Sequence, residues 1–154
     1  MHVSRRAVRV GLPVLIAALA LVAPATVSGV APHPVPRGHY LRGTPGDDVI
    51  VDNPGPDTIK GFAGNDTLSG EDGPDRLFGG PGTDTLDGGP GNDLLKGGPD
   101  ADTIGGGPGK DVIHAARDGA IDTVSCGDGD RDIAIVDATD IVAPDCERVR
   151  TPGS

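Results

Sequence analysis

The 154-residue chain has few bulky side chains: it contains no Trp, one Tyr, two Phe and one Met. A core built on aromatic rings is therefore excluded. Basic residues are also scarce, with 13 Lys or Arg against 23 Asp or Glu, so the chain lacks the basic surface that nucleic-acid binding requires. No HExxH, GxSxG or phosphate-binding loop is present, and neither Cys lies in a nucleophile motif. The sequence therefore predicts a protein that is not an enzyme.

Long apolar runs are missing as well. The longest, residues 10–22, has thirteen residues, which is too short to span a bilayer comfortably. It follows a basic segment at residues 1–9 and precedes the small residues Ala23-Pro24-Ala25. This order predicts a cleaved export signal over residues 1–25, and hence a mature chain with no membrane span that is secreted, either extracellular or cell-wall associated. Arg5-Arg6 leaves twin-arginine export open beside the general secretion route, which we prefer.

Gly and Pro are abundant, with 26 and 15 residues, a composition typical of disordered sequence unless it is periodic. Residues 43–114 are strictly periodic and divide into eight contiguous nonapeptides, such as GGPGTDTLD and GGPGNDLLK. The sixth position is always Asp: Asp48, Asp57, Asp66, Asp75, Asp84, Asp93, Asp102 and Asp111. The eighth is always Ile or Leu: Ile50, Ile59, Leu68, Leu77, Leu86, Leu95, Ile104 and Ile113. Such a register predicts a solenoid in which each unit packs on its neighbours.

Each position of the nonapeptide has a physical role. Gly at positions one, two and four permits positive φ and close backbone approach, and Pro at position three restricts φ within the turn. Such a turn exposes carbonyl oxygens beside a short carboxylate, and Ca²⁺ prefers six to eight oxygen ligands. The alternative is that each Asp is an ordinary turn residue. An acid–base role is disfavoured, because a repeated lattice gives its carboxylates identical environments.

The nonapeptide GGxGxDxUx resembles the RTX, or haemolysin-type, calcium-binding repeat, and this resemblance covers 72 of the 154 residues. It implies an all-β fold: a parallel β-roll, or right-handed β-solenoid, of about four to six coils with a C-terminal cap. It also implies Ca²⁺ ions between the turns of blocks n and n+2, up to about six ions, with the eight repeat Asp residues as ligands. Residues 43–114 hold thirteen Asp and one Glu against four Lys or Arg, so we expect folding to depend on calcium.

The flanking regions carry further expectations. Residues 26–42 read as a Pro-rich linker, in which His33 and His39 are solvated and lack a metal-ligand partner. Residues 115–150 read as degenerate repeats with a cap, followed by a tail at 151–154. The only two cysteines, Cys126 and Cys146, are expected to form a disulfide in an exported chain. Within these degenerate repeats, Asp122 and Asp132 are expected to be weak metal ligands.

Positions seven and nine of each block are expected to point outward. Odd-numbered blocks form a small, Thr-rich face, whereas even-numbered blocks carry every strand-borne cation together with Phe78 and Leu94. One hypothesis is a calcium-stabilised structural or adhesion module that contacts a cell-wall polymer, a polysaccharide or a protein partner. A second is a solenoid whose Thr face binds an ordered ligand such as ice or polysaccharide. A third is that both faces are solvated and bind nothing.

Overall fold

The computed structural model describes residues 25–28, 38–116, 118–129 and 131–153. The predicted export signal therefore lies outside the described residues, apart from Ala25. Among the described residues no helix is long and apolar enough to cross a membrane.

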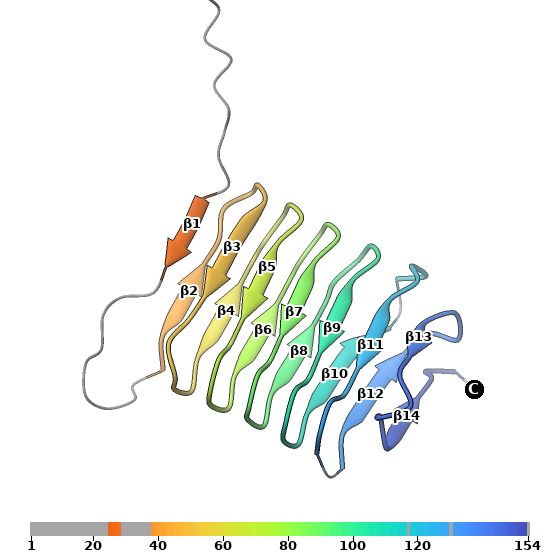
Figure 1. Cartoon of the computed structure of the whole chain (residues 1–154). Helices are drawn as coiled ribbons and strands as arrows, with labels where there is room; N and C mark the ends of the chain where they lie inside the picture. The colour runs from red at the N-terminus through yellow and green to blue at the C-terminus, as the bar shows by residue number, and fades with distance from the viewer. Residues whose placement is uncertain (1–24, 29–37, 117, 130, 154) are drawn as a thin grey trace, which may run out of the picture.

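Each nonapeptide folds as a turn followed by a short strand, and successive strands alternate between two parallel sheets (Figure 1). The first sheet contains β1 (Ala25–Ser28), β3 (Asp48–Val51), β5 (Thr67–Ser69), β7 (Thr85–Asp87), β9 (Thr103–Gly105), β11 (Thr123–Ser125) and β13 (Ile141–Val142). The second contains β2 (Tyr40–Arg42), β4 (Thr58–Lys60), β6 (Arg76–Phe78), β8 (Leu94–Lys96), β10 (Val112–Ala115), β12 (Ile133–Val136) and β14 (Arg148–Arg150). The expected all-β parallel roll is confirmed.

The core is a single apolar column between the two sheets. All eight Ile or Leu residues at position eight are at most 1% exposed, as the periodicity predicts. Val124 and Ala134 continue the column beyond the nonapeptides. Within the repeats, neighbouring strands of one sheet are exactly two blocks apart, so that Leu68 pairs with Leu86 and Leu86 with Ile104. This spacing of 18 residues stacks each turn on the turn of the block two further along.

The N-terminal end differs from the expected linker. Within residues 26–42 the structure places most of β1 beside β3 and all of β2 beside β4. The physical reason is that the first coil would otherwise leave unpaired backbone groups at both sheet edges. Leu41 packs against the core at the point where a preceding nonapeptide would place its eighth residue.

At the C-terminal end, β11 and β12 extend the sheets in register, and β13 and β14 end them. The nine-residue period breaks at this point, and the extra residues lie in the turns. The sequence separation between paired turns therefore rises from 18 residues to 20 and 21. The expected disulfide is confirmed: Cys126 bonds to Cys146 across 20 residues and ties the last segment to the final coils.

Candidate metal centre

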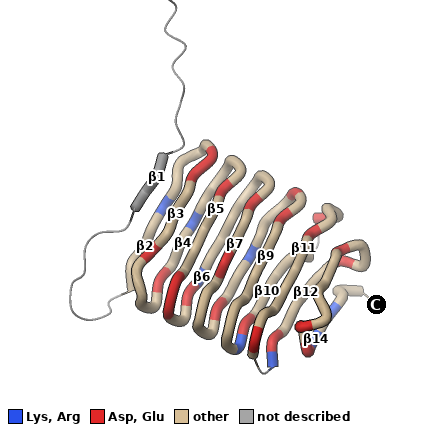
Figure 2. Tube along the Cα trace, in the orientation of Figure 1, with Lys and Arg blue, Asp and Glu red and all other residues tan. Residues whose placement is uncertain are grey.

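The eight Asp residues of position six lie in two buried columns, one along each row of turns. Asp48, Asp66, Asp84 and Asp102 form the column before the first sheet, and Asp57, Asp75, Asp93 and Asp111 form the column before the second. None is more than 3% exposed. Asp122 and Asp132 extend the two columns and are also buried. Figure 2 shows acidic residues gathered at the turns along both rows. Most of the described Lys and Arg residues lie on strands, and Lys110 and Arg131 lie in turns.

From Asp57 onward, Oδ1 of each carboxylate in the two columns accepts a hydrogen bond in a ladder that joins the coils. The backbone N–H of Asp66 donates to Oδ1 of Asp84 at 2.8 Å, and that of Asp84 donates to Oδ1 of Asp102 at 2.8 Å. The second column repeats the pattern, with Asp75 donating to Asp93 at 2.7 Å. All six pairs that the sequence predicted to lie in stacked turns are linked in this way.

The second oxygen has no such partner. From Asp57 to Asp122, Oδ2 of every carboxylate in the two columns is buried and accepts no hydrogen bond from the described residues. A buried carboxylate oxygen left unpaired is costly, and a whole row of them calls for an explanation outside the protein's own groups. The regular placement of these oxygens fits a bound cation.

The first glycine of the block keeps the space beside Oδ2 open. A methyl group on Gly88 would lie 2.6 Å from Oδ2 of Asp93 and 2.5 Å from the carbonyl oxygen of Gly106 in the next coil. A methyl group on Gly106 would similarly lie 2.6 Å from both Oδ2 of Asp111 and the carbonyl oxygen of Cys126. Carboxylate and carbonyl oxygens that converge on one small space are the ligands that Ca²⁺ prefers, at about 2.3 to 2.6 Å.

Burial makes these carboxylates reluctant to ionise. Desolvation raises the pKa of Asp102 and Asp111 to about 7, with a further rise caused by neighbouring carboxylates and a partial offset by the amide hydrogen bond. The same causes raise the pKa of Asp84 to about 6, and burial raises that of Asp93 to about 6. At neutral pH the ionised form of these buried carboxylates is disfavoured by desolvation and by mutual repulsion. A nearby cation would stabilise that form, whereas an anion would destabilise it further.

The first two blocks depart from this pattern. In block one, Thr44 stands at position two and donates from its hydroxyl to Oδ2 of Asp48 at 3.0 Å, so that oxygen is already satisfied. In block two, Asp52 stands where later blocks have their first glycine. Its carboxylate accepts a hydrogen bond from the backbone N–H of Asn53 and meets the imidazole of His39. The six blocks from Gly61 onward keep both the first glycine and the Asp.

The sequence reasoning was wrong about His39, which was expected to have no metal-ligand partner. Its Nδ1 lies 3.1 Å from Oδ1 of Asp52 and 3.5 Å from Oδ1 of Asp57. A signal was present: carrying the register back one block from Gly43 puts His39 at position six and Leu41 at position eight. The Pro-rich composition around it obscured this signal.

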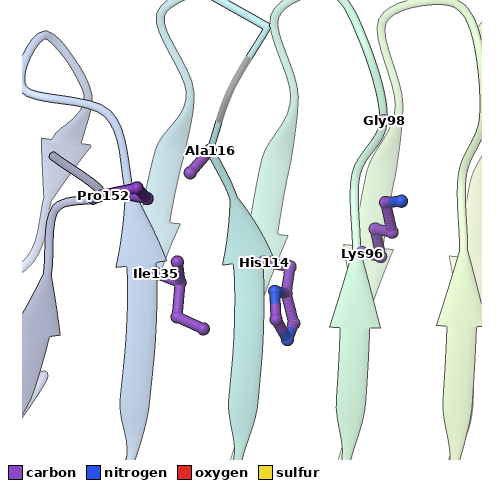
Figure 3. Close-up of a pocket in the computed structure, with 6 residues that line it drawn as sticks. All are labelled: Lys96, Gly98, His114, Ala116, Ile135 and Pro152. Atoms are coloured by element: carbon purple, nitrogen blue, oxygen red, sulfur yellow. The ribbon is translucent and has the colours of Figure 1, made fainter.

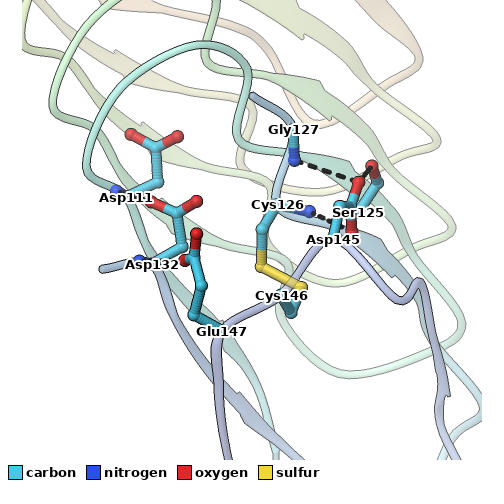
Figure 4. The surroundings of a disulfide bond; sticks show 8 residues. All are labelled: Asp111, Ser125, Cys126, Gly127, Asp132, Asp145, Cys146 and Glu147. Atoms are coloured by element: carbon cyan, nitrogen blue, oxygen red, sulfur yellow. Dashed lines mark hydrogen bonds between the residues drawn. A yellow bond between two sulfur atoms is a disulfide. The ribbon is translucent and has the colours of Figure 1, made fainter. Parts of the chain in front are cut away.

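The sequence reasoning also missed carboxylates beyond the repeats that accept hydrogen bonds from the last coils (Figure 4). The first ladder ends at Asp140, whose Oδ1 accepts from the backbone N–H of Asp122 at 3.1 Å. Oε2 of Glu147 accepts from the backbone N–H of Asp132 at 2.7 Å, in place of a further Asp. Oδ2 of Asp145 accepts from Ser125 at 2.6 Å and from Gly127 at 3.1 Å, which lowers the pKa of Asp145. These side chains accept hydrogen bonds from groups of the last coils that would pair with a further coil if the repeats continued.

Two features lie on the outer face of the second sheet. Near its C-terminal end is an open hollow of about 350 Å³ (Figure 3). It is lined by Lys96, Gly98, His114, Ala116, Ile135 and Pro152. Near the N-terminal end, cations lie over aromatic rings. Arg42 is 4.8 Å from the ring centre of Tyr40, and Lys60 is 5.5 Å from that of Phe78.

Comparison with known families agrees with the geometry. The model of the RTX calcium-binding nonapeptide repeat, which spans four copies, matches residues 42–77 and again residues 78–113. No curated protein and no solved structure matches the chain.

Proposed function

We propose that this chain, whose residues 42–113 belong to the RTX calcium-binding nonapeptide repeats, is a secreted β-roll that folds when it binds Ca²⁺ and serves a structural or adhesive role. The observation that carries the proposal is the row of buried, unpartnered Oδ2 atoms from Asp66 to Asp111, each beside the first glycine of its own block. Secretion is supported by the Cys126–Cys146 disulfide, because disulfides persist in oxidising compartments.

The proposed ligands are the eight Asp residues of position six together with carbonyl oxygens of the stacked turns. The six blocks from Gly61 onward offer the most complete sites, because each keeps the first glycine beside a carboxylate oxygen with no other partner. This count agrees with the upper bound of about six ions. When bound, Ca²⁺ supplies positive charge and coordination to buried carboxylates. The residues themselves hold the turns in register through the amide-to-Oδ1 ladder.

Coupled folding follows from the small core and the large acidic excess. The buried core cluster contains aliphatic side chains and Cys126 and no aromatic ring among the described residues, and the two carboxylate columns lie beside it. A cation that binds the folded roll and not the unfolded chain shifts the equilibrium toward the roll.

The test is far-UV circular dichroism of the full chain during a calcium titration from a chelated start, with Mg²⁺ as the control. We expect a coil spectrum that converts cooperatively to a β spectrum with Ca²⁺ alone. A β spectrum unaffected by chelation contradicts coupled folding. A coil spectrum at saturating Ca²⁺ contradicts the calcium-dependent roll as a whole.

The adhesive role rests on the cation–aromatic cluster of the second sheet, formed by Tyr40, Arg42, Lys60, Phe62 and Phe78. Tyr40 and Phe62 are 49% and 42% exposed, so their rings are open to a ligand. Exposed rings beside guanidinium and ammonium groups suit a polymer that carries both sugar rings and anionic groups. We expect Lys60→Glu to weaken binding to anionic wall polymer severalfold. Lys110→Glu, an exposed turn residue elsewhere, is the matched control. Equal binding by the two variants argues against this face.

A second candidate is an ordered ligand on the first sheet. Thr67, Thr85, Thr103 and Thr123 are exposed and paired in register on neighbouring strands, so β11 adds one Thr to the column that the repeats contain. Thr85→Tyr would disrupt this column at its middle. If wild type and Thr85→Tyr show the same thermal hysteresis and the same polysaccharide binding, the Thr face is not the binding surface. That the chain is not an enzyme stays a prediction.

A further inference from the structure

We propose that His39, Asp52 and Asp57 form a separate site, at the N-terminal end of the roll, for a borderline divalent cation such as Zn²⁺. The site needs the folded roll, but it does not rest on Ca²⁺ being bound at Asp57.

The ligand atoms lie at distances suitable for one metal ion. Nδ1 of His39 is 3.1 Å from Oδ1 of Asp52 and 3.5 Å from Oδ1 of Asp57, and the three residues each offer a ligand atom within 4.8 Å of the others. In a tetrahedral zinc site with bonds of about 2.0 to 2.1 Å, neighbouring ligand atoms are roughly 3.3 Å apart. The imidazole and the two carboxylates therefore need little movement to share an ion.

The burial of the two carboxylates provides a second, independent observation. The side chains of Asp52 and Asp57 are each 1% exposed, and Oδ2 of each accepts no hydrogen bond from the described residues. The side chain of His39 is 53% exposed, which leaves the cluster open to entry from solvent. The two buried carboxylates beside one imidazole therefore each have an oxygen, Oδ2, that is available to bind a cation.

Sequence differences explain why this site differs from the calcium positions. Asp52 replaces the first glycine, so its side chain fills the space that later blocks keep open beside the position-six Asp. His39 takes the place of a position-six Asp in the coil before, and its backbone N–H donates to Oδ1 of Asp57 as an Asp would. The two exchanges remove an oxygen-lined space and add a nitrogen ligand. Imidazole suits Zn²⁺ and related ions, whereas Ca²⁺ takes oxygen ligands.

The test is equilibrium dialysis of the full chain against Zn²⁺ in saturating Ca²⁺, so that the roll is folded and the calcium positions of the six blocks from Gly61 onward are filled. We expect one tightly bound Zn²⁺ per chain that Mg²⁺ does not displace. His39→Gln should bind Zn²⁺ at least tenfold more weakly, and His114→Gln, on the outer face of β10, should bind as wild type does. No Zn²⁺ bound by wild type, or equal binding by both variants, overturns the site.

A second variant reverses the exchange. Asp52→Gly restores the first glycine of block two, so it should lose Zn²⁺ and gain a Ca²⁺ ion. Unchanged Zn²⁺ binding by Asp52→Gly also overturns the proposal. Circular dichroism in Ca²⁺ verifies that each variant is folded. Failure of the calcium roll itself would show as a coil spectrum of wild type, and it is thereby distinguished from failure of the zinc site.

Discussion

Gly88→Ala probes the space beside Asp93 directly. The added methyl would lie 2.6 Å from Oδ2 of Asp93 and 2.5 Å from the carbonyl oxygen of Gly106, too close for either to stay in place. Gly88 is not in the left-handed region of φ, so the substitution imposes no left-handed strain. The expected effect is therefore loss of one cation position.

The magnitude follows from linkage. A site that binds only the folded state contributes about 2.7 kcal/mol when calcium is at 100 times its dissociation constant. Loss of that site should lower the unfolding midpoint by about 10 °C for a domain of this size. The free energy of unfolding should also rise less steeply with calcium, by about 1.4 kcal/mol for each tenfold increase.

The assay is thermal and urea unfolding at several calcium concentrations, together with calcium stoichiometry by equilibrium dialysis. Gly105→Ala is the matched control, because the nearest atom to its added methyl is the carbonyl oxygen of Leu86 at 3.9 Å. It should bind as many ions as wild type. If Gly88→Ala and Gly105→Ala have the same stoichiometry and the same calcium dependence, the reasoning about the space beside Asp93 is refuted.

Three further predictions test the rest of the fold. Without metal, the folded fraction should fall as pH rises from about 4 to 7, because burial raises the pKa of Asp102 and Asp111 to about 7 and the folded state then holds more protons than the unfolded chain; β content in a chelator, followed by far-UV circular dichroism, that rises between pH 5 and 7.5 would contradict this. Leu86→Ala, at a core position 1% exposed, should cost about 2 to 5 kcal/mol of unfolding free energy in Ca²⁺, against less than about 0.5 kcal/mol for exposed Thr85→Ala; similar losses in the two variants would argue against the apolar column. Replacing both Cys126 and Cys146 by Ala should cost about 3 kcal/mol, because the disulfide closes a loop across 20 residues; hydrogen exchange should show β13 and β14 losing protection first, and unchanged protection there would count against the bond as the tie of the last segment.

The ends of the roll show where sequence reasoning stopped. Residues 26–42 read as a linker because the segment is rich in Pro and lacks the Gly-Gly and Asp positions of the nonapeptide. Parts of this segment nevertheless pair with both sheets as β1 and β2. Their pairing depends on the open edges of β3 and β4, which exist only once the repeats have folded. For the same reason His39 looked isolated in the sequence. In the folded roll, turns 18 residues apart stack on one another, and this brings His39 beside Asp57.

The nine-residue period is enough to predict the coil, the core and the two carboxylate columns. A period of nine fixes which residues turn, which pair and which face inward, and each of these choices is local and repeated eight times. The residues that end the columns become apparent only in the folded chain. Asp140 and Glu147 end the two columns at the C-terminal end, and His39 contacts Asp52 at the N-terminal end. The backbone donors and carboxylates of the terminal coils must find partners that the period no longer supplies.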